Sequence, residues 1–183
     1  MSAADRGDPS PWIVRFSGLI GPGASVLDVA CGRGRHAVHF ADRGARVLGI
    51  DRDATALACV ASVPNIDIRV ADLENAPWPL HDRRFDAVVV ARYLHRPLWP
   101  MLMDAVAPDG VLIYETFSRG NERHGRPRNP DFLLSSGELL EVVRGRMRVI
   151  AFEEGQTVGE SPCVLQRIAA VGFAREQPIA FIE

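Results

Sequence analysis

The chain contains no lysine, and arginine alone supplies its 21 basic residues. This absence excludes a phosphate-binding loop built on lysine, a Schiff-base lysine and a lysine general base. Cysteine is scarce: Cys31, Cys59 and Cys163 lie far apart without Cys-x-x-Cys spacing. They are typical of reduced cytosolic thiols rather than of a disulfide framework or a zinc site, and we predict no metal site.

Long apolar runs are also missing. No run approaches the roughly 18 residues that a membrane span needs, and residues 1–10 are polar, unlike a secretory signal. We therefore expect a cytoplasmic protein with no membrane partner. Its oligomeric state is left open.

What is present is the composition of an ordinary globular domain. The 183 residues are 47% apolar and 24% charged, with a net charge of −2. We expect a single domain over residues 1–183 with one substantial core. The near-neutral charge argues against a protein whose main task is to grip nucleic acid, although it is compatible with a local basic patch.

Helix-like and strand-like segments alternate along the chain, which predicts an α/β fold with a mostly parallel sheet covered by helices on both faces. Residues 1–24 are expected to form an N-terminal helical segment and residues 25–183 a seven-stranded core. The predicted strands are 25–30, 46–50, 67–71, 85–91, 111–115, 147–153 and 163–172, the last two forming a closing hairpin. Helices are predicted over 11–20 and 35–43, from the N-cap Asp53 to 61, over 98–107, and after the capping-box pattern Ser135-x-x-Glu138.

The most informative stretch is Val26-Leu-Asp-Val-Ala-Cys-Gly-Arg-Gly-Arg-His-Ala37. A predicted strand contains Asp28, and Gly32 and Gly34 then precede a helix. Asp51 and Asp72 end the next two predicted strands. Because the carboxyl ends of parallel strands meet at one crevice, the three carboxylates are expected to lie together at a ligand site. The alternative for each aspartate alone is a turn former or a helix cap.

Two ligands fit this turn. Gly32-x-Gly34-x-x-Ala37 satisfies the dinucleotide fingerprint, in which backbone N–H groups face a pyrophosphate. A pyrophosphate would be repelled by Asp28 and Asp72, however. S-adenosylmethionine has no phosphate and carries an amine and a sulfonium, so the charge pattern favours it.

Five segments in order resemble the class I S-adenosylmethionine-dependent methyltransferases. They are the stretch from Val26 to Gly34, Gly49-Ile-Asp51, Ala71-Asp-Leu-Glu with Pro77-Trp-Pro-Leu, Arg84-Phe-Asp-Ala-Val-Val-Val, and Ala107-Pro-Asp-Gly-Val-Leu. The resemblance covers most of the chain, from Trp12 to Gly172. Within the class, the chain is most similar to the compact bacterial tellurite-resistance type.

The resemblance implies a Rossmann-like fold, S-adenosylmethionine as cofactor and S-adenosylhomocysteine as product. It further implies that the turn lines the methionine moiety, that Asp51 holds the ribose hydroxyls, and that other residues bound the adenine or close the pocket beneath the sulfonium. The implied cofactor residues are Asp28, Ala30, Gly32 and Gly34 at the turn, Asp51, Arg52, Asp72 and Leu73 around the adenosine, and Ala91 and Arg92 beneath the sulfonium.

Methyl transfer from a sulfonium is an in-line displacement, so alignment in a desolvated pocket supplies much of the catalysis. A general base is needed only for an acceptor that is protonated at working pH. After the fourth strand, His95 is the best base and Tyr93 the best orienting group, the alternative being structural roles for both.

Residues 118–132 are expected to form a loop on the acceptor side, whose positive charge would favour an anionic acceptor. The acceptor-side candidates are Arg96, Glu115, Arg119, Arg123, His124 and Arg126. For Glu115 the alternative is to hold an arginine of this loop, and for Arg96 to pair with a neighbouring carboxylate. We predict a methyltransferase acting on a small or anionic molecule, with nucleic acid and protein acceptors not excluded. The alternatives are a dinucleotide-dependent oxidoreductase and a non-catalytic cofactor-binding protein with the same fold.

Overall fold

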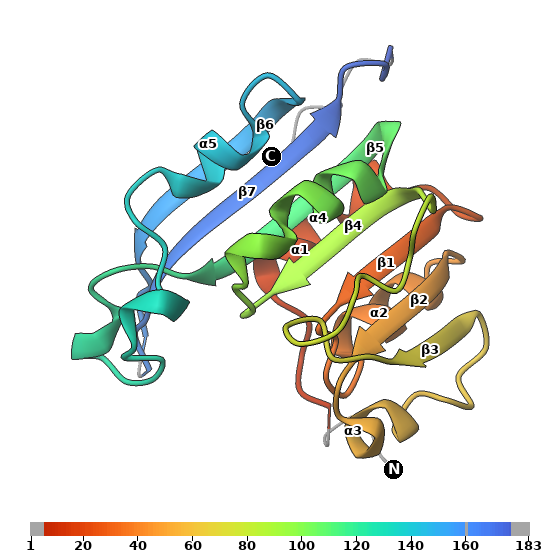
Figure 1. The fold of residues 1–183 in the computed structure, drawn as a ribbon, viewed down its shortest axis with the longest axis horizontal. Helices are drawn as coiled ribbons and strands as arrows, with labels where there is room; N and C mark the ends of the chain where they lie inside the picture. The colour runs from red at the N-terminus through yellow and green to blue at the C-terminus, as the bar shows by residue number, and fades with distance from the viewer. Residues whose placement is uncertain (1–5, 160, 177–183) are drawn as a thin grey trace.

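The computed structural model describes residues 6–159 and 161–176. Within these residues, seven strands form one sheet in the order β3-β2-β1-β4-β5-β7-β6 (Figure 1). The first five pair in parallel, and β7 runs antiparallel to both β5 and β6. The strands are β1 (Ser25–Val29), β2 (Arg46–Asp51), β3 (Ile66–Val70), β4 (Phe85–Ala91), β5 (Val106–Phe117), β6 (Met147–Gln156) and β7 (Val164–Gly172). The predicted mostly parallel sheet and its closing hairpin are confirmed.

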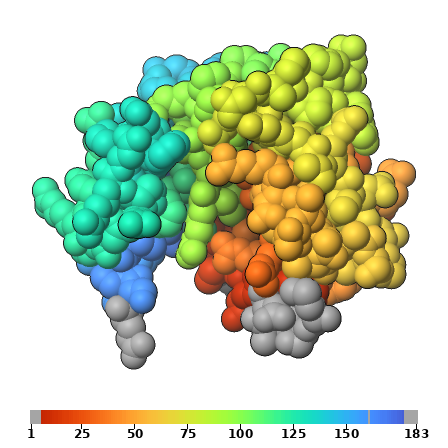
Figure 2. Space-filling model, turned by 60° about the horizontal axis from the view of Figure 1, so that its bottom comes forward, coloured from red at the N-terminus to blue at the C-terminus, as the bar shows by residue number. Residues whose placement is uncertain are grey.

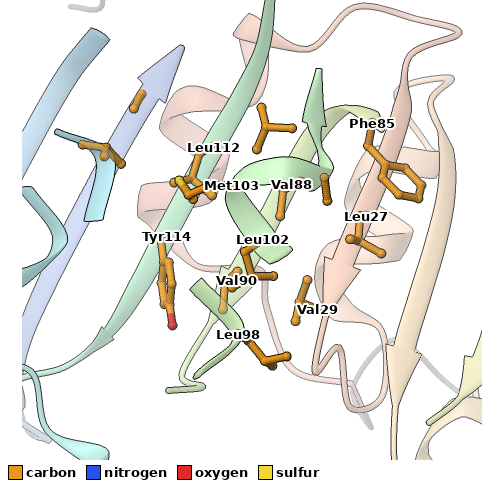
Figure 3. Close-up of a cluster of buried hydrophobic side chains, with 14 of the residues drawn as sticks. Leu27, Val29, Phe85, Val88, Val90, Leu98, Leu102, Met103, Leu112 and Tyr114 are labelled. Atoms are coloured by element: carbon orange, nitrogen blue, oxygen red, sulfur yellow. The ribbon is translucent and has the colours of Figure 1, made fainter. Parts of the chain in front are cut away.

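Side chains alternate between the two faces of the sheet, and each face has its own apolar core. On one face, α1 (Pro11–Phe16) and α2 (Arg35–Ala41) cover β1, β4 and β5. On the other, α4 (Trp99–Ala105) and α5 (Glu138–Val143) complete a second core. In Figure 3, Leu102 lies over Val88 and Val90 of the central strand β4. Leu102 is 1% exposed, so truncation to alanine would cost about 2–5 kcal/mol.

The N-terminal helix is held by a side-chain cap and by two aromatic rings. The Ser10 hydroxyl accepts a hydrogen bond from the Trp12 N–H at 3.2 Å, and the rings of Trp12 and Phe16 lie 4.5 Å apart. A 3₁₀ turn, η2 (Ser17–Leu19), extends the helix. The helix predicted over 11–20 is therefore confirmed, whereas residues 1–5 of the predicted helical segment lie outside the described residues.

The predicted boundary between the helix at 98–107 and the following strand is wrong. A 3₁₀ turn, η3 (Arg96–Leu98), precedes α4, and β5 begins at Val106, which pairs with Phe85. The register then jumps, because Ala87 pairs with Val111. A Cβ at Gly110 would lie 2.9 Å from a Val106 methyl group, so the chain folds back tightly here. The segment expected to separate helix and strand is thus a bulge within the strand.

The capping-box prediction at Ser135 is also wrong about where the helix begins. Helix α5 starts at Glu138, with Gly137 as N-cap at φ 69° and without a capping side chain. Only half of the motif forms: the Glu138 carboxylate accepts a hydrogen bond from the Ser135 N–H at 2.7 Å. The same carboxylate also binds Arg96, so it serves a tertiary contact as well as a local one.

The carboxyl ends of the parallel strands lie at one edge of the sheet. Helix α3 (Ala54–Ala58), capped by Asp53 as predicted, lies at this edge, and the segment that follows β5 lies at the opposite side of the same edge (lower right and lower left of Figure 1). That segment contains the 3₁₀ turns η4 (Asn121–Arg123) and η5 (Pro130–Phe132). Among the described residues, no helix combines the length and apolarity that crossing a membrane requires.

Candidate functional site

The turn between β1 and α2 leaves open space at the carboxyl edge of the sheet. Gly32 and Gly34 have φ angles of 55° and 72°, in the left-handed region that favours glycine. A Cβ at Gly32 would meet nothing within 4 Å, whereas one at Gly34 would lie 2.8 Å from Cγ1 of Val60. The turn therefore presents backbone, rather than side chains, to the space beyond β1.

Asp51, at the end of β2, ties this turn to the next strand. Its Oδ2 accepts a hydrogen bond from the Gly32 N–H at 2.7 Å, and its Oδ1 accepts one from the Asp53 N–H at 2.9 Å. A carboxylate oxygen accepts more than one hydrogen bond, so both oxygens retain capacity for a ligand. Asp51 is half-buried and faces a pocket.

That pocket has a volume of about 160 Å³ and is built from the ends of β1 to β4. Five predicted cofactor residues share it, and it also contains Tyr93, Ala71 and Glu74. The predicted members are Ala30, Asp51, Arg52, Asp72 and Leu73. Glu74 and Ala71 were missed, although they flank the predicted Asp72-Leu73 pair directly. The structure thus brings the adenosine-side candidates together.

Asp72 also forms a local turn, as its alternative interpretation predicted. Its Oδ1 accepts from the N–H groups of Glu74 and Asn75, and its Oδ2 accepts from the Asn75 side chain at 2.9 Å. The Asn75 amide, followed by these backbone groups, holds the pKa of Asp72 below its ordinary value. Asp72 is therefore an oriented carboxylate at the wall of the pocket.

Tyr93 lies in the wall of the same pocket, although it was predicted as an acceptor-orienting group. Its hydroxyl is buried and has no hydrogen-bond partner among the described residues. Burial, and then the nearby carboxylates of Glu74 and Asp72, raise the pKa of Tyr93. The hydroxyl therefore stays a neutral donor, and it faces the adenosine-side candidates.

Asp28 is buried behind the turn and does not line that pocket. Its Oδ2 has no hydrogen-bond partner within the described part of the chain, while the Ala37 N–H donates to the carboxylate. Burial raises the pKa of Asp28 to about 7, despite this hydrogen bond and the charge of Arg35. An unpartnered buried carboxylate is costly, so this position calls for a cation.

The end of β4 carries positive charge. Arg92 follows Ala91 with a φ of 55°, and its guanidinium lies 5.9 Å from the centre of the Phe117 ring. Burial, and then the charge of Arg92, lower the pKa of Arg35. Two arginines therefore approach each other beside Asp28.

Arg96 pairs with a carboxylate, as its alternative predicted, whereas Glu115 pairs with an arginine outside the loop. Arg96 forms a two-pronged ion pair with Glu138, at 2.6 and 3.0 Å, and donates to the carbonyls of Asp131 and Leu133. It therefore anchors the chain beyond β5. Glu115 is buried and pairs with Arg167 of β7 at 2.8 Å, not with an arginine of the loop. Both partners are distant in the sequence, so neither pairing had a local signal.

The remaining acceptor-side candidates lie around a hollow at the carboxyl edge. Figure 2 shows the segment after β5 (teal) separated from the β2 and α3 region (orange) by this hollow. His95 is half-buried, and its backbone carbonyl accepts from Leu98 at 3.0 Å, while its side chain makes no capping hydrogen bond. Exposed on the segment are Arg119, Arg123, His124 and Arg126.

Comparison with known proteins identifies the domain. The family described as "Methyltransferase domain" matches residues 26–108, from β1 to the bulge of β5. A Mycolicibacterium smegmatis protein named "Probable S-adenosylmethionine-dependent methyltransferase" is 32% identical over 75% of this chain and 55% of its own length. The chain carries a class I S-adenosylmethionine-dependent methyltransferase domain. Membership of this class makes S-adenosylmethionine its cofactor.

Further relatives agree with this methyltransferase fold. A "tRNA U34 carboxymethyltransferase" of Methylococcus capsulatus is 27% identical over 91% of this chain and 56% of its own length. The chain thus spans about half the length of the curated relatives it matches. The structure of TehB from Haemophilus influenzae superposes with a TM-score of 0.73 at 17% identity, over 87% of this chain and 61% of that one. A TehB-like methyltransferase from Corynebacterium glutamicum has a TM-score of 0.65 at 21% identity, over 93% and 91%.

The candidate site has charges that suit S-adenosylmethionine. The pocket wall contains the carboxylates of Asp51, Asp72 and Glu74, which suit ribose hydroxyls and an adenine amine and oppose a phosphate. The unpartnered Oδ2 of Asp28 suits an ammonium group, and the buried hydroxyl of Tyr93 can donate a hydrogen bond to an oxygen or nitrogen of the cofactor. The residues present therefore fit S-adenosylmethionine.

Proposed function

We propose that this chain is a methyltransferase that uses S-adenosylmethionine to methylate a small or anionic acceptor in the cytoplasm. The observation that carries the proposal is the acidic pocket at the ends of β1 to β4, beside an unpartnered buried carboxylate. A dinucleotide would place its pyrophosphate against these acids, which disfavours the oxidoreductase alternative. The family and the named relatives support the same choice.

Each wall of the site has its own task in this proposal. Asp51 binds the ribose, Asp72 and Leu73 flank the adenine, and Asp28 holds the ammonium group. When bound, S-adenosylmethionine supplies an electrophilic methyl group on a sulfonium. Arg92 and the end of β4 exclude water beside it, and His95 accepts a proton from acceptors that carry one.

The cationic side of the hollow supports an anionic acceptor. Besides burial, the charge of Arg92 lowers the pKa of Arg35, although the carboxylates of Glu115 and Asp28 act in the opposite direction. No carboxylate lies within ion-pair distance of either arginine among the described residues. An acceptor carboxylate, phosphate or oxyanion would relieve the repulsion between the two arginines. The named function of the Methylococcus capsulatus relative keeps tRNA among the candidate acceptors.

Calorimetry tests the proposal directly. The full chain is titrated with S-adenosylmethionine, S-adenosylhomocysteine and NADH. We expect one molecule of each of the first two to bind, and no heat from NADH. The proposal fails if neither sulfur compound binds at millimolar concentration. Cofactor binding without methyl transfer to a broad panel of anions and nucleic acids would favour the non-catalytic alternative.

A further inference from the structure

The 118–132 segment concentrates positive charge on one bank of the hollow (teal in Figure 2). It carries four arginines against two acidic residues in a chain of net charge −2. All four are exposed, and none takes part in an ion pair within the described residues; they are Arg119, Arg123, Arg126 and Arg128. Positive charge is therefore concentrated on this segment, although the net charge of the whole chain is close to zero.

Buried contacts fix the backbone that displays these arginines. The side chain of Asn121, 1% exposed, donates to the Pro127 carbonyl at 3.3 Å and accepts from the Val164 N–H at 3.1 Å. The Arg119 N–H donates to the Leu134 carbonyl at 2.9 Å. Arg96 adds its bond to the Asp131 carbonyl at 2.7 Å. The segment is thus a built scaffold rather than a loose connection.

Exposure of the guanidinium groups distinguishes between a small ion and a polymer. Fully hydrated charges gain little from one small anion, whereas a phosphodiester strand contacts several of them and releases counterions at each contact. Phe132 is 46% exposed on the same segment, and an exposed aromatic ring offers a base a stacking surface.

We infer that the 118–132 segment is a docking surface for single-stranded nucleic acid, one nucleotide of which enters the hollow as the methyl acceptor. This inference rests on the proposed methyltransferase function and names the acceptor class for the same site. Of the small or anionic acceptors in the proposed function, the inference selects the anionic kind and identifies it as a phosphate-bearing strand.

Fluorescence anisotropy of the full chain with labelled 20-nucleotide RNA and DNA strands, over a series of salt concentrations, tests the inference. The variant is Arg123→Glu with Arg128→Glu. The control, Arg46→Glu with Arg84→Glu, changes the total charge equally, at residues where β2 begins and just before β4. Polyglutamate and inorganic phosphate serve as competitors, and S-adenosylhomocysteine binding is measured on every protein.

We expect the wild type and the control to bind at least one of the two strands, and the segment variant to bind it at least about tenfold more weakly. The salt slope of the variant should be shallower by about 1.4, because each lost single-strand phosphate contact removes about 0.7. An equal loss in the control, competition by polyglutamate at equal charge, or displacement by millimolar phosphate would overturn the inference. Cofactor binding without strand binding would refute only this docking surface, whereas strand binding without cofactor binding would refute the proposed function.

Discussion

Replacing Asp28 with asparagine should make the protein more stable and, at the same time, poor at binding its cofactor. Burial raises the pKa of Asp28 from 3.8 to about 7. At about 1.4 kcal/mol per factor of ten, keeping this carboxylate ionised in the folded protein costs on the order of 4 kcal/mol. Asparagine resembles the neutral acid, but its buried amide lacks a partner and costs about 1–3 kcal/mol. We therefore expect a net gain of about 2 kcal/mol at pH 8.

The sign of the pH dependence follows from the two pKa values of Asp28. Between pH 3.8 and about 7 the folded protein keeps the proton that the unfolded chain releases. The stabilisation of the folded protein by this more tightly held proton is therefore complete below pH 3.8 and is lost as the pH rises through about 7. The wild type should lose stability relative to the asparagine variant between pH 5 and pH 8. Because other groups titrate equally in both proteins, the difference between them isolates Asp28.

Urea unfolding of both proteins at pH 5, 6, 7 and 8 measures this difference. Calorimetry with S-adenosylhomocysteine in two buffers of different ionisation enthalpy measures the affinity of each protein and the number of protons released on binding. We expect wild-type binding to release about half a proton at pH 7 and the variant to bind about 10- to 150-fold more weakly, as loss of a charged hydrogen bond predicts. A constant stability difference across the pH range, or unchanged affinity in the variant, would refute the assigned role of Asp28.

Three further substitutions separate the parts of the site. Asp51→Ala should weaken S-adenosylhomocysteine binding about 100-fold. The control, Asp53→Ala, removes a helix cap, so it should cost about 1 kcal/mol of stability and leave the affinity within about twofold. Unchanged affinity in Asp51→Ala would show that the ribose site is misplaced. Tyr93→Phe should weaken binding about fivefold without loss of stability, because its hydroxyl has no partner in the free protein; equal affinity would mean that this hydroxyl never meets the cofactor. Glu138→Gln should lower the free energy of unfolding by about 1–3 kcal/mol in urea titrations, because Arg96 loses its ion pair. A change below about 0.5 kcal/mol would show that this ion pair does not stabilise the fold.

The sequence predicted the sheet well because its strands carry strong local signals. The run over 85–91 is apolar and β-branched, and it is the buried central strand β4. Asp53 caps α3 by accepting hydrogen bonds from the N–H groups of Thr55 and Ala56, which lie two and three residues further along the chain. These two local signals held, whereas the equally local capping-box pattern at Ser135 misplaced the start of α5.

The sequence could not name contact partners that lie far apart along the chain. Arg96 meets Glu138 42 positions away, and Glu115 meets Arg167 across β5 and β7. Only the folded sheet brings these partners together. Tyr93 likewise lines the pocket of the adenosine-side candidates because β4 lies next to β1, and its role in orienting the acceptor stays a prediction.

A crystal structure of the chain with S-adenosylhomocysteine would test the central claim most directly. The account predicts the adenosine in the pocket at the ends of β1 to β4, with the ribose hydroxyls within about 3.2 Å of the Asp51 carboxylate and the ammonium group beside Asp28. Density for the ligand at another edge of the sheet, or an adenosine that leaves Asp51 and Tyr93 uncontacted, would contradict it.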